Sequence, residues 1–290
     1  KFATFIFHSH SDNRFLDLAN RSSKKIISQI NNLGGVNRDE ITYVFDSSIC
    51  ASGILSLSKV RKLSDEEVAG VRLLSDFVSE SLSKNFTAFL NNQNYSDKSR
   101  WSLSFGSLHL KTIIGLYEAA IFFKEESYLE TCQLVHKKII RDCFDEGRFS
   151  INKYKKWTYT HPHCYATEGL IFFDHVGFSD NKKLISQSAD WLAESQNEDG
   201  SLYGWYNRNN IKFTKQNDAT SQAVRIWIYS DKEKYKDNIA KALNFLSNYV
   251  STDGGLYYNN ESKDINSWVS MFCFQALDWQ LNGPKTDFLI

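Results

Sequence analysis

The sequence predicts an all-α fold built from repeated helical hairpins, and three observations support this prediction. A glycine-containing turn recurs at Gly147, Gly200 and Gly254, with steps of 53 and 54 residues between successive glycines. Helices with one apolar stripe alternate along the chain with helices that are apolar almost all round. The 290 residues include only two prolines, so long helices can run without interruption. A near-constant step of this size indicates structural repeats.

The first half of the chain opens with a short aromatic segment, residues 1–15, whose structure is ambiguous from the sequence. The helix that follows is expected to end at Gly34-Gly35, because glycine is common just past a helix end. Ser64 and Glu67 have the spacing of a capping box, which opens an amphipathic helix. The helices expected in this half span residues 17–32, 43–55, 64–82 and 108–123, of which 43–55 and 108–123 are the apolar ones.

The second half repeats one cycle: an amphipathic helix, a tight turn, and a more apolar helix rich in small residues. Asp199 and Asp253 are expected to form their turns, with the glycine that follows each of them at positive φ. The amphipathic helices expected here span residues 127–140, 184–192 and 239–246, and the apolar ones span 165–173, 219–227 and 268–279.

This alternation of helices predicts how the hairpins are arranged. A single amphipathic helix cannot bury its apolar face, but stacked hairpins bury it together. A helix that is apolar all round belongs inside, which favours two concentric rings of helices. The sequence therefore predicts an α/α toroid of five to six helical hairpins, forming a single domain over residues 1–290. An open helical solenoid is the alternative, and it is disfavoured because the inner helices show little polar face.

Composition excludes several classes of partner. Lysine plus arginine and aspartate plus glutamate are balanced at 34 each, which removes the electrostatic reason to expect nucleic acid or an anionic membrane surface. No run of about 18 apolar residues occurs, so no transmembrane helix is expected. The five cysteines are irregularly spaced, as expected of buried thiols in a cytoplasmic protein. The sequence indicates no oligomeric state.

Two turns carry a family resemblance. The run Gln-Asn-Glu-Asp-Gly-Ser at 196–201 and the turn at 253–255 resemble the QxxDG-type repeats of terpenoid cyclases and protein prenyltransferases, and this resemblance implies the α/α toroid. The chain departs from that superfamily in its chemistry. It has no DxDD acid motif, and Pro162 stands where prenyltransferases have the aspartate of a zinc-binding Asp-x-Cys-Tyr motif. No metal and no cofactor are therefore predicted.

A second resemblance concerns carbohydrate chemistry. The runs 160–170 and 266–272 look similar to toroid proteins encoded with bacterial surface-polysaccharide genes. The same architecture carries N-acylglucosamine 2-epimerases, unsaturated uronyl hydrolases and polysaccharide lyases. The resemblance implies a carbohydrate-active enzyme that acts on a sugar or glycan in the central cavity by hydrolase-, lyase- or epimerase-type acid–base chemistry. Such an enzyme could serve in bacterial surface-polysaccharide biosynthesis.

The start of each apolar helix is where binding residues are expected. If these helices run parallel, their N-termini share one rim of the toroid, where helix dipoles favour anions. Tryptophan beside polar groups suits stacking on a sugar. Aspartate in such a position is also a favoured helix cap, an alternative that applies to Asp46 and Asp218. The residues expected to bind substrate are Asp46, Trp101, His109, Trp157, Tyr165, Arg225, Asn266 and Trp268.

The run His161-Pro162-His163 is the sharpest candidate for catalysis, because histidine titrates near neutrality and suits general acid–base work. The expected catalytic residues are His161 and His163, with Asp218 or Glu168 as the carboxylate. The alternative is that both histidines are structural. Glu168 and Arg225 are charges inside apolar helices, and they could equally form a structural pair between adjacent helices.

Two other functions stay open at this point. An isoprenoid cyclase or a prenyltransferase-like enzyme would have a cavity lined mainly by aromatic side chains, with few polar groups deep inside. A non-catalytic glycan-binding or scaffold toroid would have its rim residues engaged in helix caps.

Overall fold

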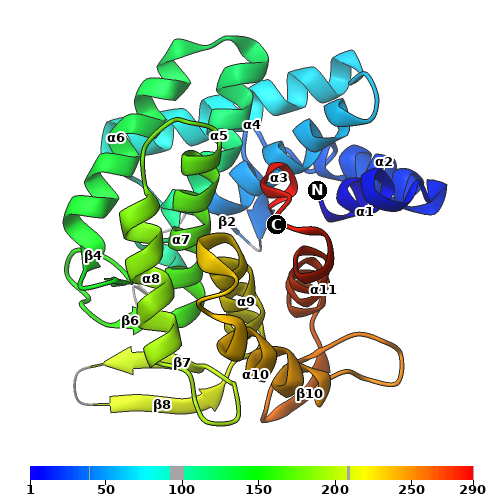
Figure 1. Ribbon diagram of the computed structural model, residues 1–290. Coiled ribbons are helices and arrows are strands. Elements are labelled where there is room, and N and C mark those ends of the chain that lie inside the picture. The colour runs from blue at the N-terminus through cyan, green and yellow to red at the C-terminus, as the bar shows by residue number, and fades with distance from the viewer. Residues whose placement is uncertain (39, 92–100, 208–209, 290) are drawn as a thin grey trace. The chain divides into compact units, whose positions relative to one another are not determined.

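The computed structural model describes residues 1–289 except 39, 92–100 and 208–209 (Figure 1). The contacts group the chain into two compact units: an N-terminal unit, Lys1–Arg141, and a C-terminal unit, Asp142–Ile290. Each unit is built mainly of helices. The expectation of a single domain stays a prediction. Among the helices that these residues form, none combines the length and apolar character needed to cross a membrane.

Among its described residues, the N-terminal unit contains the four helices expected in the first half of the chain, the helix expected at 127–140, and one helix that was not expected. The ambiguous first segment forms helix α1, and α2 ends at Ile27, five residues before the expected end. The apolar helix α3 packs against both α4 and α5. The elements are α1 (Phe2–His10), α2 (Asn13–Ile27), β1 (Asn37–Arg38), β2 (Ile41–Tyr43), α3 (Val44–Ser56), η1 (Leu57–Lys59), α4 (Asp65–Asn85), β3 (Phe89–Asn91), η2 (Trp101–Leu103), α5 (His109–Phe123) and α6 (Glu126–Cys143).

Local signals explain parts of this unit. The capping box predicted at Ser64 and Glu67 is confirmed: each side chain binds the backbone N–H of the other residue. The strands form one antiparallel sheet in the order β1-β2-β3, and β2 leads directly into α3. This sheet therefore lies at the N-terminal end of an apolar helix.

The C-terminal unit repeats the predicted cycle. Helix α9 packs against α7, which is also mostly buried, against α11, which is buried along one face only, and against the amphipathic helices α8 and α10 (Figure 1). The elements are β4 (Phe144–Asp145), β5 (Arg148–Phe149), β6 (Thr158–Tyr159), α7 (Thr160–His175), α8 (Lys182–Glu194), β7 (Tyr203–Asn207), β8 (Asn210–Lys215), α9 (Asn217–Asp231), α10 (Lys236–Ser247), β9 (Tyr257–Asn259), β10 (Ser262–Ile265), α11 (Ser267–Asn282) and η3 (Thr286–Phe288).

Burial confirms the two kinds of helix within this unit. Every residue of α9 from Asn217 to Ile228 is buried, whereas α10 buries a single stripe. Trp227 of α9 is fully buried and donates a hydrogen bond from Nε1 to the carbonyl oxygen of Ala189 in α8, at 3.0 Å. The inner helix therefore holds the outer one by a polar contact as well as by packing.

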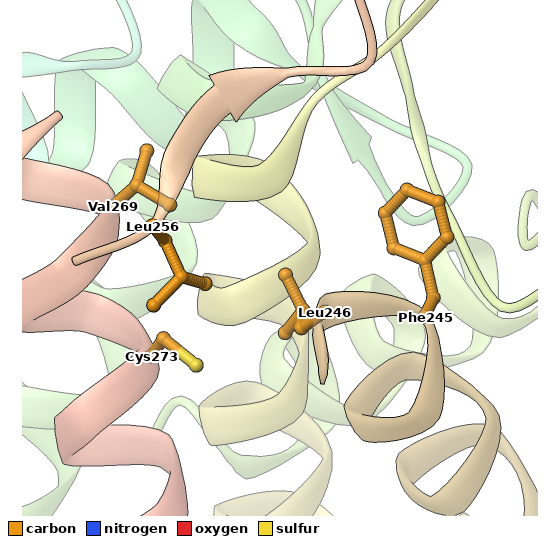
Figure 2. Close-up of a cluster of buried hydrophobic side chains, with 5 residues drawn as sticks. All are labelled: Phe245, Leu246, Leu256, Val269 and Cys273. Atoms are coloured by element: carbon orange, nitrogen blue, oxygen red, sulfur yellow. The ribbon is translucent and has the colours of Figure 1, made fainter. Parts of the chain in front are cut away.

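Figure 2 shows one apolar cluster that joins successive elements of the unit. Phe245 and Leu246 come from α10, Leu256 from the segment before β9, and Val269 and Cys273 from α11. All five are at most 5% exposed. Burying a side chain of this size stabilises a fold by about 1.5–3 kcal/mol, so the cluster fixes α10 against α11.

The two Asp-Gly turns share one hydrogen-bond pattern. The N–H of Asn197 donates to the oxygen of Ser201 at 2.9 Å, and the N–H of Gly200 donates back to Asn197 at 2.9 Å. The same two bonds link Ser251, Gly254 and Gly255 in the next repeat, at 2.7 and 3.0 Å. Both central glycines have positive φ, 91° and 83°, which confirms the predicted turns.

The pattern also occurs where the sequence did not indicate it, at residues 31–35. Asn31 and Gly35 form the outer bond at 2.9 Å, Gly34 forms the inner one at 2.9 Å, and Gly34 has φ 83°. The turn at Gly147 is different. It is the two-residue loop of the β4–β5 hairpin, in which Glu146 and Gly147 both have positive φ. The turn predicted at Gly147 is therefore present, but its geometry differs from that of the turns at Gly200 and Gly254.

Three of these turn glycines, Gly34, Gly147 and Gly200, pack on the backbone of an amphipathic helix about forty residues further along the chain. A Cβ on Gly34 would lie 2.9 Å from the carbonyl oxygen of Leu73, and a Cβ on Gly147 would lie 2.6 Å from that of Gln187. A Cβ on Gly200 would overlap the carbonyl oxygen of Lys241 in α10. Glycine is thus required by the close approach of two backbones as well as by φ.

Short β-hairpins, which the sequence analysis did not predict, precede the apolar helices of this unit. Strand β6 pairs with β7, and β7 pairs with β8, so the segments before α7 and α9 form one antiparallel sheet. Strands β9 and β10 form a second hairpin before α11. Trp205 and Tyr206 are adjacent in β7, and this departure from apolar–polar alternation hid the strand.

We expect Gly200→Ala to destabilise the protein more than Gly254→Ala does. Both substitutions place alanine at positive φ, which costs about 1–2 kcal/mol. Only the Cβ at Gly200 meets neighbouring backbone, because nothing described lies within 4 Å of a Cβ at Gly254. Overpacking of this kind adds about 1–3 kcal/mol. Urea denaturation of the two variants measures the difference, and equal losses would show that the turn does not depend on the contact with α10.

Candidate functional site

Helix α7 begins with the segment that carried the catalytic prediction. Tyr159 is its N-cap, in extended conformation, so His161, Pro162 and His163 lie in the first turn. Pro162 fits there because the first-turn N–H groups have no partner within the helix. Two residues along a helix correspond to about 200° of rotation, so His161 and His163 face different sides of α7.

His161 faces α9, and its Nδ1 lies between two side chains of that helix. Nδ1 is 2.7 Å from Oε1 of Gln222 and 3.4 Å from Oδ2 of Asp218. Gln222 donates from Nε2 to the carboxylate of Glu168 at 3.2 Å, which fixes the amide orientation and turns Oε1 toward the imidazole. Nδ1 must then carry the hydrogen, and Nε2 is the basic nitrogen of the neutral ring.

Asp218 is the carboxylate nearest to His161. It is 4% exposed, and burial raises its pKa while the charge of His161 opposes the shift. Its Oδ1 accepts the N–H of Ala219 at 2.7 Å. Two tyrosine hydroxyls, those of Tyr159 and Tyr258, lie near Asp218 and form a hydrogen bond with each other. Burial is the largest cause that raises the pKa of both hydroxyls, and the negative charge of Asp218 is the second. Asp218 is the second residue of α9, after the N-cap Gln216, so it does not occupy the N-cap position, although its carboxylate does bind a first-turn N–H group.

Beneath this pair lies a fully buried polar chain across three helices. Glu168 of α7 and Arg225 of α9 form an ion pair, and both side chains have no exposed area. Arg225 also donates to Oε1 of Gln275 in α11, and Nε2 of Gln275 donates to the carbonyl oxygen of Phe288 at 2.9 Å. The structural pair between adjacent helices is thus confirmed, and it occupies both charges that were expected to meet substrate.

Aromatic rings surround His161 on the side of α11. The centre of the Tyr165 ring is 4.2 Å from the centre of the imidazole ring, and the centre of the Phe272 ring is 6.1 Å from it. Trp268, at the start of α11, is 5.7 Å from Phe272 and is 39% exposed. Tyr165 and Trp268, both predicted to bind substrate, therefore belong to the surroundings of His161.

A second series of rings leads from His161 to the surface. Tyr159 lies 6.4 Å from the imidazole and stacks on Trp205 of β7 at 4.3 Å, with 7° between the ring planes. Trp205 lies 5.8 Å from Trp157, which is 41% exposed. The β6–β7 pairing aligns Tyr159 with Trp205, so a strand missed in the sequence places this ring.

His163 is not part of this group. It is fully buried, its Nδ1 accepts the N–H of Phe149 at 3.1 Å, and its ring packs edge-on against Trp191 of α8 at 4.7 Å. Burial lowers its pKa to about 3. The expectation that both histidines act together is therefore not supported, because the helical register turns His163 toward the outer helix.

The remaining predicted residues have local roles or lie in the other unit. Asn266 caps α11 by accepting the N–H of Val269 at 3.1 Å. His109 is buried at the start of α5, where its Nδ1 lies 3.2 Å from the Gly106 oxygen and burial lowers its pKa to about 4. Asp46, in the first turn of α3, lies 3.9 Å from Arg38. The Trp101 side chain lies outside the described part of the structure.

Gln222 and Trp205 are the members of the site that the sequence analysis missed. Gln222 stands three residues before Arg225 in an otherwise apolar stretch, and a helix brings such positions to the same face. That spacing is the signal that could have linked it to Arg225. Among the residues that the structure describes, no group of three or more His, Cys, Asp or Glu side chains is arranged to hold a metal ion.

We expect Arg225→Met to lower the free energy of unfolding by about 3–5 kcal/mol, because Glu168 would be left buried without its partner. Adding Glu168→Gln in the same chain should restore part of the loss. The control is Lys84→Met, which removes an exposed ion pair with Glu80 and should cost no more than about 1 kcal/mol. Urea denaturation measures all three, and an Arg225→Met loss as small as the control's would contradict the role of the pair.

Asp218→Asn should stabilise the protein at neutral pH. In the folded protein the carboxyl of Asp218 has a pKa above its ordinary value of 3.8, so its ionised form destabilises the fold. This loss of stability is absent below pH 3.8, where the carboxyl is protonated in both states, and it grows as the pH rises above 3.8. The gain in free energy of unfolding should therefore shrink as pH falls from 8 toward 4. Denaturation of both proteins across this range tests it. A gain that is the same at every pH would be inconsistent with the raised pKa.

Comparison with known proteins identifies structures that share the fold. No protein-family model matches the sequence, and no curated protein matches it. Among solved structures, cellobiose 2-epimerase from Bacillus thermoamylovorans is similar with a TM-score of 0.76 and 13% identity, over 94% of this chain and 83% of that one. An unsaturated glucuronyl hydrolase from Streptococcus agalactiae has a TM-score of 0.73 and 12% identity, over 99% and 80%. A family 88 glycosyl hydrolase from Bacteroides vulgatus has a TM-score of 0.69 and 14% identity, over 95% and 88%.

These similarities extend over nearly the whole chain, and the matched structures are α/α toroids. The predicted fold class is confirmed, and the open solenoid is not supported. Identities this low speak for the fold alone, and the resemblance to terpenoid cyclases stays a prediction. The chain is an all-α protein with the α/α-toroid fold.

Proposed function

We propose that the protein is a carbohydrate-active enzyme whose acid–base centre is His161 with Asp218 in the C-terminal unit. The observation that carries the proposal is the fixed imidazole. His161 is 12% exposed at its side chain, and its Nδ1 hydrogen is directed at Gln222 and Asp218, so Nε2 is the ring nitrogen that carries no hydrogen. A histidine that is oriented by a carboxylate at one ring nitrogen can act as a general base through the other.

The chemistry of these two groups follows from their positions. Nε2 of His161 takes a proton from a sugar carbon, a hydroxyl or a water molecule and later returns it. The imidazolium formed in that step is stabilised by Asp218, whose Oδ2 lies 3.4 Å from Nδ1. Hydrolysis, elimination and epimerisation all contain such a proton transfer. The solved structures that share this fold include an epimerase and a hydrolase, which supports this group of reactions.

The surroundings of His161 favour a sugar over an isoprenoid. Aromatic rings next to hydrogen-bonding side chains are what a sugar needs, with its apolar faces and polar edge. An isoprenoid site would have few polar groups in depth. Here Gln222, Glu168 and Arg225 lie buried directly behind the imidazole. The described part of the unit therefore supports the carbohydrate hypothesis over the cyclase alternative.

The setting of the reaction is also part of this proposal. The similarity of residues 160–170 to toroid proteins of surface-polysaccharide gene groups supports a role in bacterial polysaccharide biosynthesis. All five cysteines are free, four of them buried, which supports a reducing compartment such as the cytoplasm.

We expect His161→Ala to lower kcat/KM by about 10²–10⁴-fold, the usual contribution of a general base. Asp218→Asn should also lower turnover, in opposition to its effect on stability. The assays are epimerisation of cellobiose followed by NMR, hydrolysis of an unsaturated glucuronyl disaccharide, and cleavage of a uronate polymer.

The matched control is His175→Ala, on the same helix but 46% exposed at its side chain, which should leave turnover unchanged. Turnover that survives His161→Ala would remove His161 from the mechanism. Activity on farnesyl diphosphate in place of all three sugars would favour the isoprenoid alternative.

A further inference from the structure

The segment 150–157 carries an exposed basic and aromatic surface that the acid–base centre does not use. We name it the Trp157 loop. It contains three lysines and no acidic residue, and its aromatic residues Tyr154 and Trp157 are 86% and 41% exposed. Exposed apolar surface that is bordered by polar groups is typical of binding surfaces. The lysines are Lys153, Lys155 and Lys156.

The loop is held in a defined conformation. The side chain of Asn152 accepts the N–H groups of Tyr154 and Lys155 at 2.9 and 2.8 Å. The N–H of Ile151 donates to the oxygen of Trp157 at 3.0 Å and closes the loop at its base. The exposed rings are therefore presented by a fixed backbone, which lowers the entropy lost on binding.

The Trp157 loop is continuous with the proposed acid–base centre. Trp157 lies 5.8 Å from Trp205, Trp205 stacks on Tyr159 at 4.3 Å, and Tyr159 lies 6.4 Å from His161. Trp157 and Trp205 are partly exposed, whereas Tyr159 is 8% exposed and is covered on one face by Trp205, so the two tryptophans are the rings that can contact a bound chain. The ammonium group of Lys155 lies 6.0 Å from the centre of the Trp157 ring, so the outermost ring has a positive charge beside it.

We infer that the Trp157 loop is an outer subsite for an anionic sugar residue of an oligosaccharide whose other end reaches His161. This inference rests on the proposed function and adds the substrate class, an acidic glycan. Trp157 supplies the stacking face, and the lysines supply positive charge for a carboxylate or sulfate group; the ammonium group of Lys156 also donates to the carbonyl oxygen of Asp142 at 3.0 Å. An anionic membrane surface would suit lysines and exposed rings too, but it does not account for the series of rings that leads to His161.

The test is binding of tetragalacturonate to the whole chain by isothermal titration calorimetry, with cellotetraose as the neutral probe. Trp157→Ala should weaken tetragalacturonate binding about tenfold, the effect of losing 1.4 kcal/mol at a binding hot spot. The triple variant Lys153→Gln, Lys155→Gln, Lys156→Gln should weaken it at least as much and remove the preference over cellotetraose. The control triple Lys182→Gln, Lys183→Gln, Lys236→Gln changes charge equally, at exposed positions elsewhere in the unit, and should have no effect.

His161→Ala separates the two proposals, because it should abolish turnover and leave tetragalacturonate binding intact. Binding that depends on Trp157 in a protein without turnover would uphold the subsite and overturn the proposed enzyme. Equal losses in both lysine triples would overturn the subsite. So would binding to phosphatidylserine vesicles that depends on Trp157 without any binding of tetragalacturonate.

Discussion

The buried ion pair between Glu168 and Arg225 is the constraint on which the C-terminal unit depends. Two full charges without solvent exposure are tolerated only when each is matched, and here the match comes from three helices. Glu168 fixes α7, Arg225 fixes α9, and Gln275 extends the chain to α11. Because each partner would be costly to leave alone, the three inner helices must keep one register relative to one another.

The same pair sets the geometry of the chemistry above it. Glu168 orients the amide of Gln222, and that amide orients the imidazole of His161. A change in helix register would therefore alter which nitrogen of His161 is the base. Burial of the Asp218 carboxylate beside the imidazole destabilises the folded protein, as the raised pKa of Asp218 indicates. Stability and reactivity are thus in tension at one residue.

The fold could be predicted because its signals are local and repeated. Gly200 and Gly254 mark turns by composition and spacing, and the buried face of α9 follows from its apolar sequence. The candidate site could be predicted only in part, because the directions of its side chains depend on the register of one helix. Pro162 lies inside the first turn of α7 and not before the helix, so His161 and His163 diverge. Strand β7 was missed because Trp205 and Tyr206 break the apolar–polar alternation, and one of its two partners, β6, lies over forty residues away.

The turn glycines also bear on how the chain reaches its structure. Gly34, Gly147 and Gly200 each contact a helix about forty residues further along, so these repeats are joined through neighbours in sequence. Such contacts close short loops, which favours fast, stepwise assembly from any repeat that forms first. The same arrangement lets a repeat be gained or lost with little disturbance beyond the adjoining ones. A chain built this way can change the number of its hairpins more easily than the residues of any one turn.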